Sequence, residues 1–178
     1  MPMFFSKPKG PKVTDVIFLN ENGFKHAIAK WMQQHADGIV GTWFQQDLEH
    51  LRQAFPGEAE HRFALSDRLA FMHDSGSKPI LFAGHYPLHS SEQSLCDELG
   101  LKEMEVYSHL DMGLFHFFGG EKLKELMTTM GVQEDEPLTH AMITKAISNA
   151  QDKIAKQCPA DLHALSEAEW MRVNVQPK

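Results

Sequence analysis

Histidine is abundant in this sequence, with 11 among 178 residues, and imidazole nitrogens are common zinc ligands. His85 and His89, in the run HYPLH, have the i,i+4 spacing at which one helical turn presents two imidazoles to a zinc ion. Pro87 lies between them and disfavours a regular helix at this point. We therefore favour two loop histidines at the end of a strand, and we predict that His85 and His89 hold no transition metal.

A second pair of histidines, His109 and His116, lies further along the chain and could converge on the first pair. A catalytic zinc would also need a polarising carboxylate, for which Glu92 and Asp111 are candidates. The sequence contains no H-E-x-x-H motif. These histidines nevertheless follow predicted strands, and open α/β sheets bind ligands beyond the carboxyl ends of their strands. An enzyme or sensor with a metal or small-ligand site at the four histidines therefore stays open as an alternative function.

The possible nucleophiles of this region lack the surroundings that would activate them. Cys96 lies among acidic residues, which raise the pKa of a thiol, so we expect an inert cysteine buried on a helix. Ser90 and Ser91 are not part of a G-x-S-x-G motif, which argues against acyl transfer. We expect Ser90 to cap a helix instead, with Gln93 completing a capping box.

These residues lie in a chain whose apolar runs alternate with helical patterns. Runs such as VTDVIFL are short, β-branched and aromatic, as in buried strands, and the segments between them carry apolar residues at helical spacing. Strands that alternate with helices of this length imply parallel crossovers, so we predict an α/β fold. IVGTWF and ILFAG should be central strands, because both are apolar on both faces. The predicted strands are residues 13–19, 39–44, 80–84 and 104–110.

The middle of the chain admits two interpretations. Residues 61–66, HRFALS, could form a short strand, or residues 58–74 could form one helix. The run SGS at 75–77 predicts a loop in both cases. The sheet should accordingly contain about four or five strands.

A pair of helices is predicted for the stretch FFGGEKLKELMTTMGVQEDEPLTHAMITKAISNAQDK, residues 117–153. The first helix spans 121–130 and ends at Gly131, where a left-handed cap favours glycine. Thr139 is positioned to cap the second helix. Pro159 prevents that helix from continuing much beyond Cys158.

Both of these helices carry an apolar stripe that must be buried against something. A continuous stripe left in water would be an unusually large exposed patch for a soluble monomer. It could pack on the sheet, be covered by Leu162, Trp170 and Met171 of the tail, or bind another protein. The candidate partner-contact residues are Leu123, Met127 and Met130 of the first helix and Met142, Ile143, Ile147 and Ile154 of the second.

Composition restricts the partners and the compartment. The formal net charge is −7 and the chain has no basic run, which argues against nucleic acid and anionic lipid as partners. No apolar run is long enough for a membrane span. The 2 cysteines lack C-x-x-C spacing, so we expect reduced thiols and a cytoplasmic protein. The remaining candidate partners are another protein or a second copy of this chain.

The last third of the sequence also resembles a known family. FGGEKLKELMTTMGVQEDEPLTHAMITKAISNAQDKI is similar to the segment of the bacterial SecA preprotein translocase motor that leaves its second nucleotide-binding domain and enters the helical scaffold. That family has an FG-x-x-[KR] turn, a helix ending in MG, an acidic turn with E-P, a histidine, and a helix with A…AQ-K. The resemblance upstream is weaker and includes the V-G-T of residues 40–42. It implies a RecA-like (P-loop NTPase-type) arrangement of the sheet.

The resemblance also implies how the chain is divided. Residues 1–12 would be a flexible N-terminal tail, and residues 13–118 a SecA-like second motor domain. Residues 119–178 would be a helical C-terminal segment that corresponds to the start of the scaffold. The apolar patch in MPMFFSKPKGPK is too short for a signal peptide.

The ATP chemistry of the SecA family is not carried over to this chain. No phosphate loop G-x-x-x-x-G-K-[ST] occurs in the sequence. The family pattern QLRGRSGRQGD, whose arginines stabilise the transferring phosphoryl group, would fall on residues 93–105, which contain no arginine. Its GRGTDI pattern has no counterpart either. We therefore assign no catalytic residue and no cofactor, and we predict no ATPase activity above background.

Together these observations predict a degenerate, non-catalytic motor-domain remnant. It would act as a protein-binding or regulatory module, and the SecA resemblance implies a link to protein translocation. The histidine-based enzyme or sensor is the alternative. Metal bound to the purified protein would favour the alternative, whereas protein partners without metal would favour the binding module.

Overall fold

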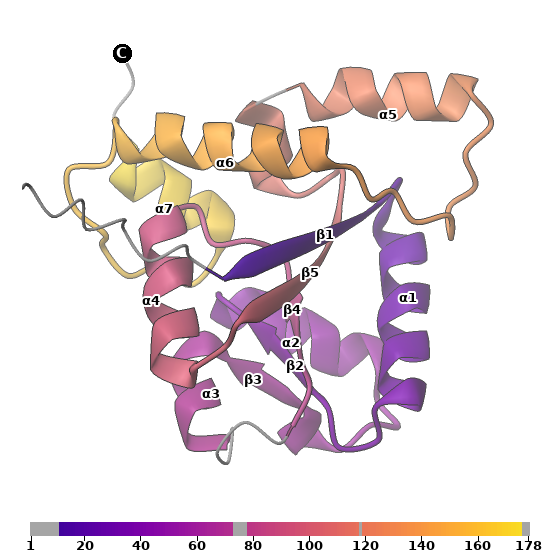
Figure 1. The fold of residues 1–178 in the computed structure, drawn as a ribbon, viewed down its shortest axis with the longest axis vertical. Coiled ribbons are helices and arrows are strands. Elements are labelled where there is room, and N and C mark those ends of the chain that lie inside the picture. The colour runs from indigo at the N-terminus through magenta and orange to yellow at the C-terminus, as the bar shows by residue number, and fades with distance from the viewer. Residues whose placement is uncertain (1–10, 73–77, 118, 176–178) are drawn as a thin grey trace, which may run out of the picture.

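The apolar runs of the sequence form a five-stranded parallel sheet (Figure 1). The computed structural model describes residues 11–72, 78–117 and 119–175 of the chain. The strands lie in the order β1-β5-β4-β2-β3, and each neighbouring pair is parallel. Their bounds are β1 (Lys12–Phe18), β2 (Ile39–Thr42), β3 (Phe63–Leu65), β4 (Ile80–Ala83) and β5 (Glu103–His109).

The two strands expected at the centre of the sheet are both internal. β2 lies between β4 and β3, and β4 lies between β5 and β2. Leu81 on β4 pairs with Val40 on one side and with Glu105 on the other. The residues of β2 are all buried, as expected for a strand with both faces covered. The predicted α/β, RecA-like fold, with a mostly parallel sheet of four or five strands, is therefore confirmed.

Helices cover both faces of the sheet, as predicted. The first two helices pack on the face that carries Val40 and Leu81, and the next two pack on the face that carries Ile39 and Phe82 (Figure 1). Each helix buries its apolar stripe against the sheet, which is the main source of helical stability in a protein of this kind. Their bounds are α1 (Glu21–Gln34), α2 (Gln45–Ala54), α3 (Ser66–Met72) and α4 (His89–Leu99).

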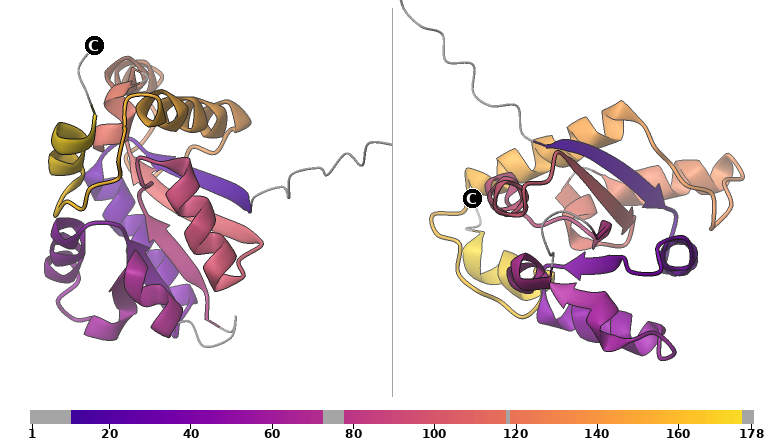
Figure 2. Two further views of the ribbon diagram at one scale, coloured as in Figure 1. Left: turned by 90° about the vertical axis from the view of Figure 1, so that its left-hand side faces the viewer. Right: turned by 60° about the horizontal axis from the view of Figure 1, so that its bottom comes forward.

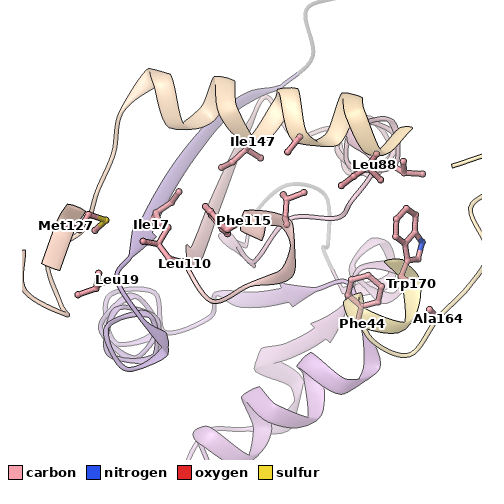
Figure 3. Close-up of a cluster of buried hydrophobic side chains, with 13 residues drawn as sticks. Ile17, Leu19, Phe44, Leu88, Leu110, Phe115, Met127, Ile147, Ala164 and Trp170 are labelled. Atoms are coloured by element: carbon pink, nitrogen blue, oxygen red, sulfur yellow. The ribbon is translucent and has the colours of Figure 1, made fainter. Parts of the chain in front are cut away.

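The last third of the chain lies over the carboxyl ends of the strands (Figure 2). α6 packs on β1 and buries Ile147, Ala150 and Ile154 in one cluster with Leu110 and Trp170 (Figure 3). This cluster is separate from the two cores between the sheet and α1–α4. The elements of this part are η2 (Gly113–Phe117), α5 (Gly120–Thr129), α6 (Ala141–Ala155) and α7 (Glu167–Asn174).

The loop between α5 and α6 attaches this part of the chain to the outer edge of β1. Ile17 and Leu138 exchange two backbone hydrogen bonds of 2.9 Å each, which form an isolated antiparallel bridge. The same loop passes so close to α1 that a Cβ atom at Gly23 would lie 1.6 Å from the carbonyl oxygen of Glu134. Glycine is therefore required at position 23 for this packing.

The middle of the chain follows the strand interpretation. β3 is formed by Phe63–Leu65, after a single 3₁₀ turn, η1 (Glu60–Arg62), and α3 begins directly after it at Ser66. One helix over 58–74 is therefore wrong, because Phe63 and Ala64 are buried in the sheet beside β2. The predicted loop at 75–77 lies outside the described residues.

Two predicted helix caps need correction. Ser90 does not cap α4, because that helix begins one residue earlier, at His89, with Leu88 at the cap position. Thr139 does not cap α6. The cap position directly before the helix is occupied by His140, whose Nδ1 accepts the N–H of Met142 at 3.1 Å. The left-handed cap at Gly131 is confirmed, with φ at +76°. In the described part of the chain, no helix has the length and apolarity needed to cross a membrane.

Candidate functional site

The carboxyl ends of β2 and β4 mark the point at which the sheet topology reverses. The connection from β2 leads through α2 to β3 on one side, and the connection from β4 leads through α4 to β5 on the other. Open α/β sheets bind ligands in the crevice at such a point. Trp43 follows β2 directly, and Gly84 and His85 follow β4. His85 therefore lies where a ligand site is expected in this architecture.

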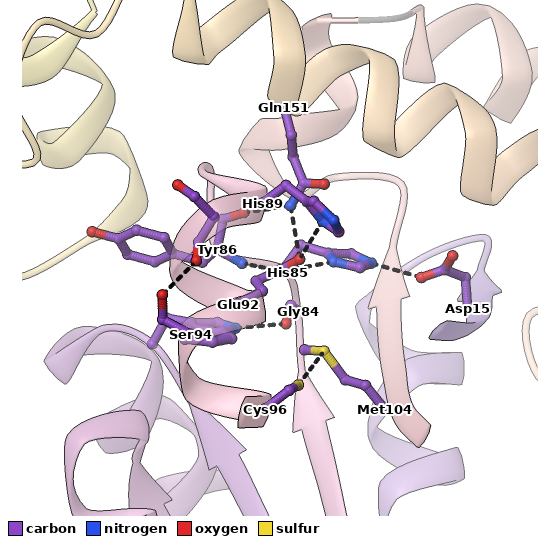
Figure 4. A network of polar contacts seen from close by, with 12 residues as sticks. Asp15, Gly84, His85, Tyr86, His89, Glu92, Ser94, Cys96, Met104 and Gln151 are labelled. Carbon is purple, nitrogen blue, oxygen red and sulfur yellow. Dashed lines mark hydrogen bonds and ion pairs between the residues drawn. The ribbon is translucent and has the colours of Figure 1, made fainter. Parts of the chain in front are cut away.

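His85 is buried at this edge between two carboxylates (Figure 4). Its Nε2 lies 2.6 Å from Oδ1 of Asp15 on β1, and its Nδ1 lies 2.8 Å from Oε1 of Glu92 on α4. All three side chains are at most 3% exposed. Carboxylate oxygens only accept hydrogen bonds, so a protonated imidazole that donates from both nitrogens fits this geometry.

Burial and charge act in opposite directions on the pKa values of this pair. Burial lowers the pKa of His85, but the charge of Glu92 and hydrogen bonds with Asp15 and Glu92 outweigh burial and raise it to about 10. Burial raises the pKa of Glu92, but the charge of His85 and the hydrogen bonds around it lower that pKa to about 2. At neutral pH a cationic His85 therefore faces an anionic Glu92 in the interior.

Gln151 connects this ion pair to the C-terminal part of the chain. Its Nε2 donates to Oε2 of Glu92 at 2.9 Å and to the carbonyl oxygen of Tyr86 at 2.8 Å. The N–H of Tyr86 in turn donates to Oε1 of Glu92 at 2.8 Å. The network therefore joins β1, β4, α4 and α6. Because nearly all of its polar atoms find partners inside the protein, it fixes α6 in place over the strand ends.

The segment after α6 adds a second set of polar contacts to this edge. Oδ1 of Asp161 accepts the hydroxyl of Tyr86 at 2.5 Å and Nε1 of Trp170 at 2.8 Å. Trp170 is fully buried, and its ring meets that of Tyr86 edge to face at 5.7 Å. The C-terminal segment is thus held by both polar and aromatic contacts.

A carboxyl group of α7 closes the remaining space at the crevice. Glu167 accepts the backbone N–H groups of Gly113 at 3.0 Å and Leu114 at 2.9 Å. Burial raises the pKa of Glu167 to about 7 and that of Asp47 to about 6. The cavity that these carboxyl groups line together with His85 has a volume of about 20 Å³. That space holds about one water molecule and no metabolite.

An open cleft lies on the other side of Trp43, where β2 and β3 end. Its volume is about 500 Å³, within the range of small-ligand and side-chain binding pockets. α3 and α4 provide part of its wall, and Tyr86, Asp161 and Leu165 provide the rest. The carboxyl edge of this sheet is therefore closed over β4 and β5 and open beside β2 and β3.

The four candidate histidines do not form one cluster. His85 is buried in the network, and Nδ1 of the half-exposed His89 lies 3.7 Å from Oε2 of Glu92. Nδ1 of His109 lies 3.8 Å from Oδ2 of Asp111, and burial lowers the pKa of His109. His116 is exposed on η2. Within residues 11–72, 78–117 and 119–175, no three His, Cys, Asp or Glu side chains are placed to hold a metal ion.

Cys96 lies on α4 and is fully buried, as predicted. Burial, with smaller contributions from Glu92 and Asp97, raises the pKa of its thiol to about 11. A nucleophilic role is therefore disfavoured by the surroundings that the structure gives this residue.

The important residues that sequence reasoning missed are Asp15, Gln151, Asp161 and Glu167. Asp15 is the single acidic residue inside the apolar run VTDVIFL, and Gln151 lies on the apolar face of its helix beside Ile147 and Ile154. A polar residue in an apolar stripe indicates a buried hydrogen bond, so both were detectable. Asp161 and Glu167 lie in polar sequence and carry no such signal.

The candidate partner-contact stripe divides into buried and exposed parts. Ile147, Ile154 and Met127 are buried within the chain, so these three residues are not available to a partner, and their assignment is corrected. Leu123 and Ile143 are partly buried. Met130 and Met142 are 71% and 73% exposed. The cover over α6 comes from Trp170 and the partly buried Met171, whereas Leu162 is exposed.

Comparison with known proteins gives a short but repeated similarity. No protein-family model matches this chain. The protein translocase subunit SecA of Syntrophobacter fumaroxidans is 45% identical over 51 residues, which is 29% of this chain and 6% of that protein. The SecA proteins of Sorangium cellulosum and Treponema pallidum are 39% identical over 53 residues and 44% identical over 50 residues. These matches cover 30% and 28% of this chain, and 5% and 6% of those proteins. This chain is therefore similar to protein translocase subunit SecA over a short segment, and it spans about one twentieth of the length of the relatives it matches.

Proposed function

We propose that this chain is a non-catalytic module that binds another protein and is linked to protein translocation. Two observations support the proposal: the similarity to a stretch of SecA, and the parallel α/β sheet of the chain. The names of the relatives supply the link to translocation. The absence of catalysis and the binding role are argued from the chain's own residues.

The observation that carries the proposal is the closed crevice. The strand ends at which an α/β enzyme would bind its ligand are filled by the ion pair of His85 and Glu92, by Trp170 and by Glu167. Glu167 accepts the N–H groups of Gly113 and Leu114, and the space left holds about one water molecule. In addition, the sequence contains no phosphate loop and no arginine over residues 93–105. Together these features argue against nucleotide chemistry in this crevice.

The surface that we propose for binding lies on α5 and the first turn of α6. Three apolar side chains there are more than half exposed, and we call them the helix-pair surface: Leu126 (56%), Met130 (71%) and Met142 (73%). Methionine side chains adapt their shape to a partner more easily than branched ones. α5 also projects from the body of the protein (Figure 1), where a partner has access to it.

The catalytic half of the proposal is tested by ATP turnover and by equilibrium binding of a fluorescent ATP analogue. We expect no turnover above background and no saturable binding at physiological ATP concentrations. Robust turnover that disappears when a residue of this chain is substituted would overturn the proposal.

The binding half is tested by sedimentation of the purified chain alone and mixed with the SecA protein of the same cell. We expect a complex with SecA or a homodimer, which Met130→Asp together with Met142→Asp should weaken without unfolding the chain. Asn149→Asp adds one negative charge at an exposed position on α6 and should have no effect. A chain that stays monomeric and does not bind SecA would refute the binding role.

A further inference from the structure

The open cleft beside the closed crevice has the features of a built site. It lies between α3, α4 and the segment 161–165, and its volume is about 500 Å³. Trp43 and Tyr86 stand side by side at its wall, with ring centroids 5.3 Å apart. Nε1 of Trp43 donates to the carbonyl oxygen of Gly84 at 3.0 Å, and the hydroxyl of Tyr86 donates to Asp161. These bonds fix the polar edges of both rings, while both residues remain partly exposed.

The charges around this cleft are all of one sign. Asp67, Glu98 and Asp161 line it, and none of its lining residues is a lysine or an arginine. Asp161 is satisfied by the neutral donors Tyr86, Ser91 and Trp170. Asp67 and Glu98 form no ion pair with any residue in the described ranges of the chain. The cleft therefore offers negative charge that no basic group of the described chain neutralises.

Apolar side chains lie next to these carboxylates. Leu65 and Leu95 line the cleft together with Leu165, which is 57% exposed. Carboxylates beside an aliphatic and aromatic wall match the lysine and arginine side chains, which have an apolar stem and a charged head. The faces of tryptophan and tyrosine also attract such cations.

We propose that this cleft binds a lysine or arginine side chain presented by an extended segment of a protein partner. The basic head lies between Asp67 and Glu98 and over the ring of Trp43, and the neighbouring apolar residues of the segment contact Leu165. This inference rests on the proposed protein-binding function and specifies the chemistry of the bound segment. The net charge of −7 attracts a basic segment to this surface from a distance.

Fluorescence anisotropy with labelled nonapeptides tests this inference. The probe carries Leu-Arg-Leu at the centre of a Gly/Ser background, and matched peptides carry Gln or Glu in place of Arg. We expect saturable binding of the Arg peptide that weakens as salt is raised, and no binding of the Glu peptide. Equal binding of the Arg and Gln peptides would overturn the proposal, because the charge would then play no part.

Variants of the cleft locate the binding. Glu98→Gln and Asp67→Asn should each weaken Arg-peptide binding by about two- to fivefold, as expected for an exposed charge pair. Trp43→Leu should weaken it by about two- to thirtyfold through loss of the cation–π contact. Glu125→Gln changes the charge equally at an exposed position on α5 and should leave binding unchanged. If Trp43→Leu does not fold, the two carboxylate variants decide, and unchanged binding in both would refute the proposed site.

Two further arms separate the sources of binding. Free arginine amide should displace the peptide only at concentrations well above that of the peptide, because the peptide also contacts Leu165. Displacement by arginine amide at the same concentration as the peptide would mean a site for small cations and overturn the proposal. The association tested on the helix-pair surface uses residues outside this cleft. If the chain associates with SecA or with itself but does not bind the Arg peptide, the proposed cleft site is refuted and the proposed function stands.

Discussion

The two halves of the sheet's carboxyl edge have opposite characters although they are built from neighbouring strands. Over β4 and β5, buried charges, a buried tryptophan and α6 leave a cavity of about 20 Å³. Beside β2 and β3, the same edge is open in a cleft of about 500 Å³ that Asp67, Glu98 and Asp161 line. The difference comes from where the C-terminal segment packs.

This comparison shows that an α/β sheet can fill its own ligand position. The ion pair of His85 and Glu92 lies where the fold would place a ligand, and Gln151 holds a helix over it. Substitutions in the closed half should change the free energy of unfolding, whereas substitutions in the open half should change the affinity for a partner.

Replacing the cation of the closed half should cost the most stability. His85→Ala leaves Asp15 and Glu92 buried without their partner, which should lower the free energy of unfolding by about 3–5 kcal/mol. Urea unfolding followed by circular dichroism measures this. His61→Ala removes an exposed histidine and should change stability by less than about 0.5 kcal/mol. Equal effects of the two substitutions would show that the buried pair does not stabilise the fold.

The pH dependence of stability should show the proton on His85. Its folded pKa is raised to about 10, above the ordinary value of 6.5, so its stabilising contribution is complete below pH 6.5 and is lost as pH rises toward 10. Between pH 7 and 10 the free energy of unfolding should fall by about 1.4 kcal/mol per pH unit. His85→Gln carries no such proton and should show a flatter curve over this range. Parallel curves for the two proteins would contradict a protonated His85.

Removing the link between α6 and the network should have an intermediate effect. Gln151→Leu removes the amide that donates to Oε2 of Glu92 and to the carbonyl oxygen of Tyr86, which should cost about 1–3 kcal/mol. Gln157→Leu is a matched change outside the network, in a residue whose side-chain amide donates to the carbonyl oxygen of Lys153. If thermal unfolding of the two variants is indistinguishable, Gln151 does not fix α6 on the sheet.

The smallest change in stability is expected in the open half. Glu98→Gln removes an exposed charge that forms no ion pair within the described ranges, so the free energy of unfolding should change by less than about 0.5 kcal/mol. The same substitution should reduce binding of a basic peptide, as argued above. A loss of more than about 1 kcal/mol would mean that this carboxylate supports the fold rather than a partner.

The fold was more predictable than the site, and the residues show why. β2 and β4 are short apolar runs, and a strand buried on both faces carries that signal in its own sequence. The site depends on contacts between segments far apart in the chain: Asp15 meets His85, and Glu92 meets Gln151. No local pattern states which histidine meets which carboxylate. His85 was singled out, but as a loop residue at the end of a strand, because Pro87 disfavours a regular helix there.

The division into a closed and an open half could not be read from the sequence for a related reason. It depends on Asp161, Glu167 and Trp170, and no local pattern around these residues indicates which side chains they contact. The sequence was compatible with three ways of burying the apolar stripe of α6, and in the structure the stripe packs at the strand ends. Long-range packing therefore decided the site, whereas local patterns decided the elements.

The bridge between Ile17 and Leu138 has a consequence for the order in which the chain becomes structured during synthesis. β1 is made early, but its neighbour in the sheet is β5, where Asp15 pairs with Val106, and its other edge is covered by Leu138. On the ribosome, β1 therefore has no partner on either side until most of the chain has emerged. Distant parallel pairing is slow, and an open strand edge is a template for association with other chains. We expect the newly made chain to depend on a holding chaperone until its last third is complete, after which the same edge is protected.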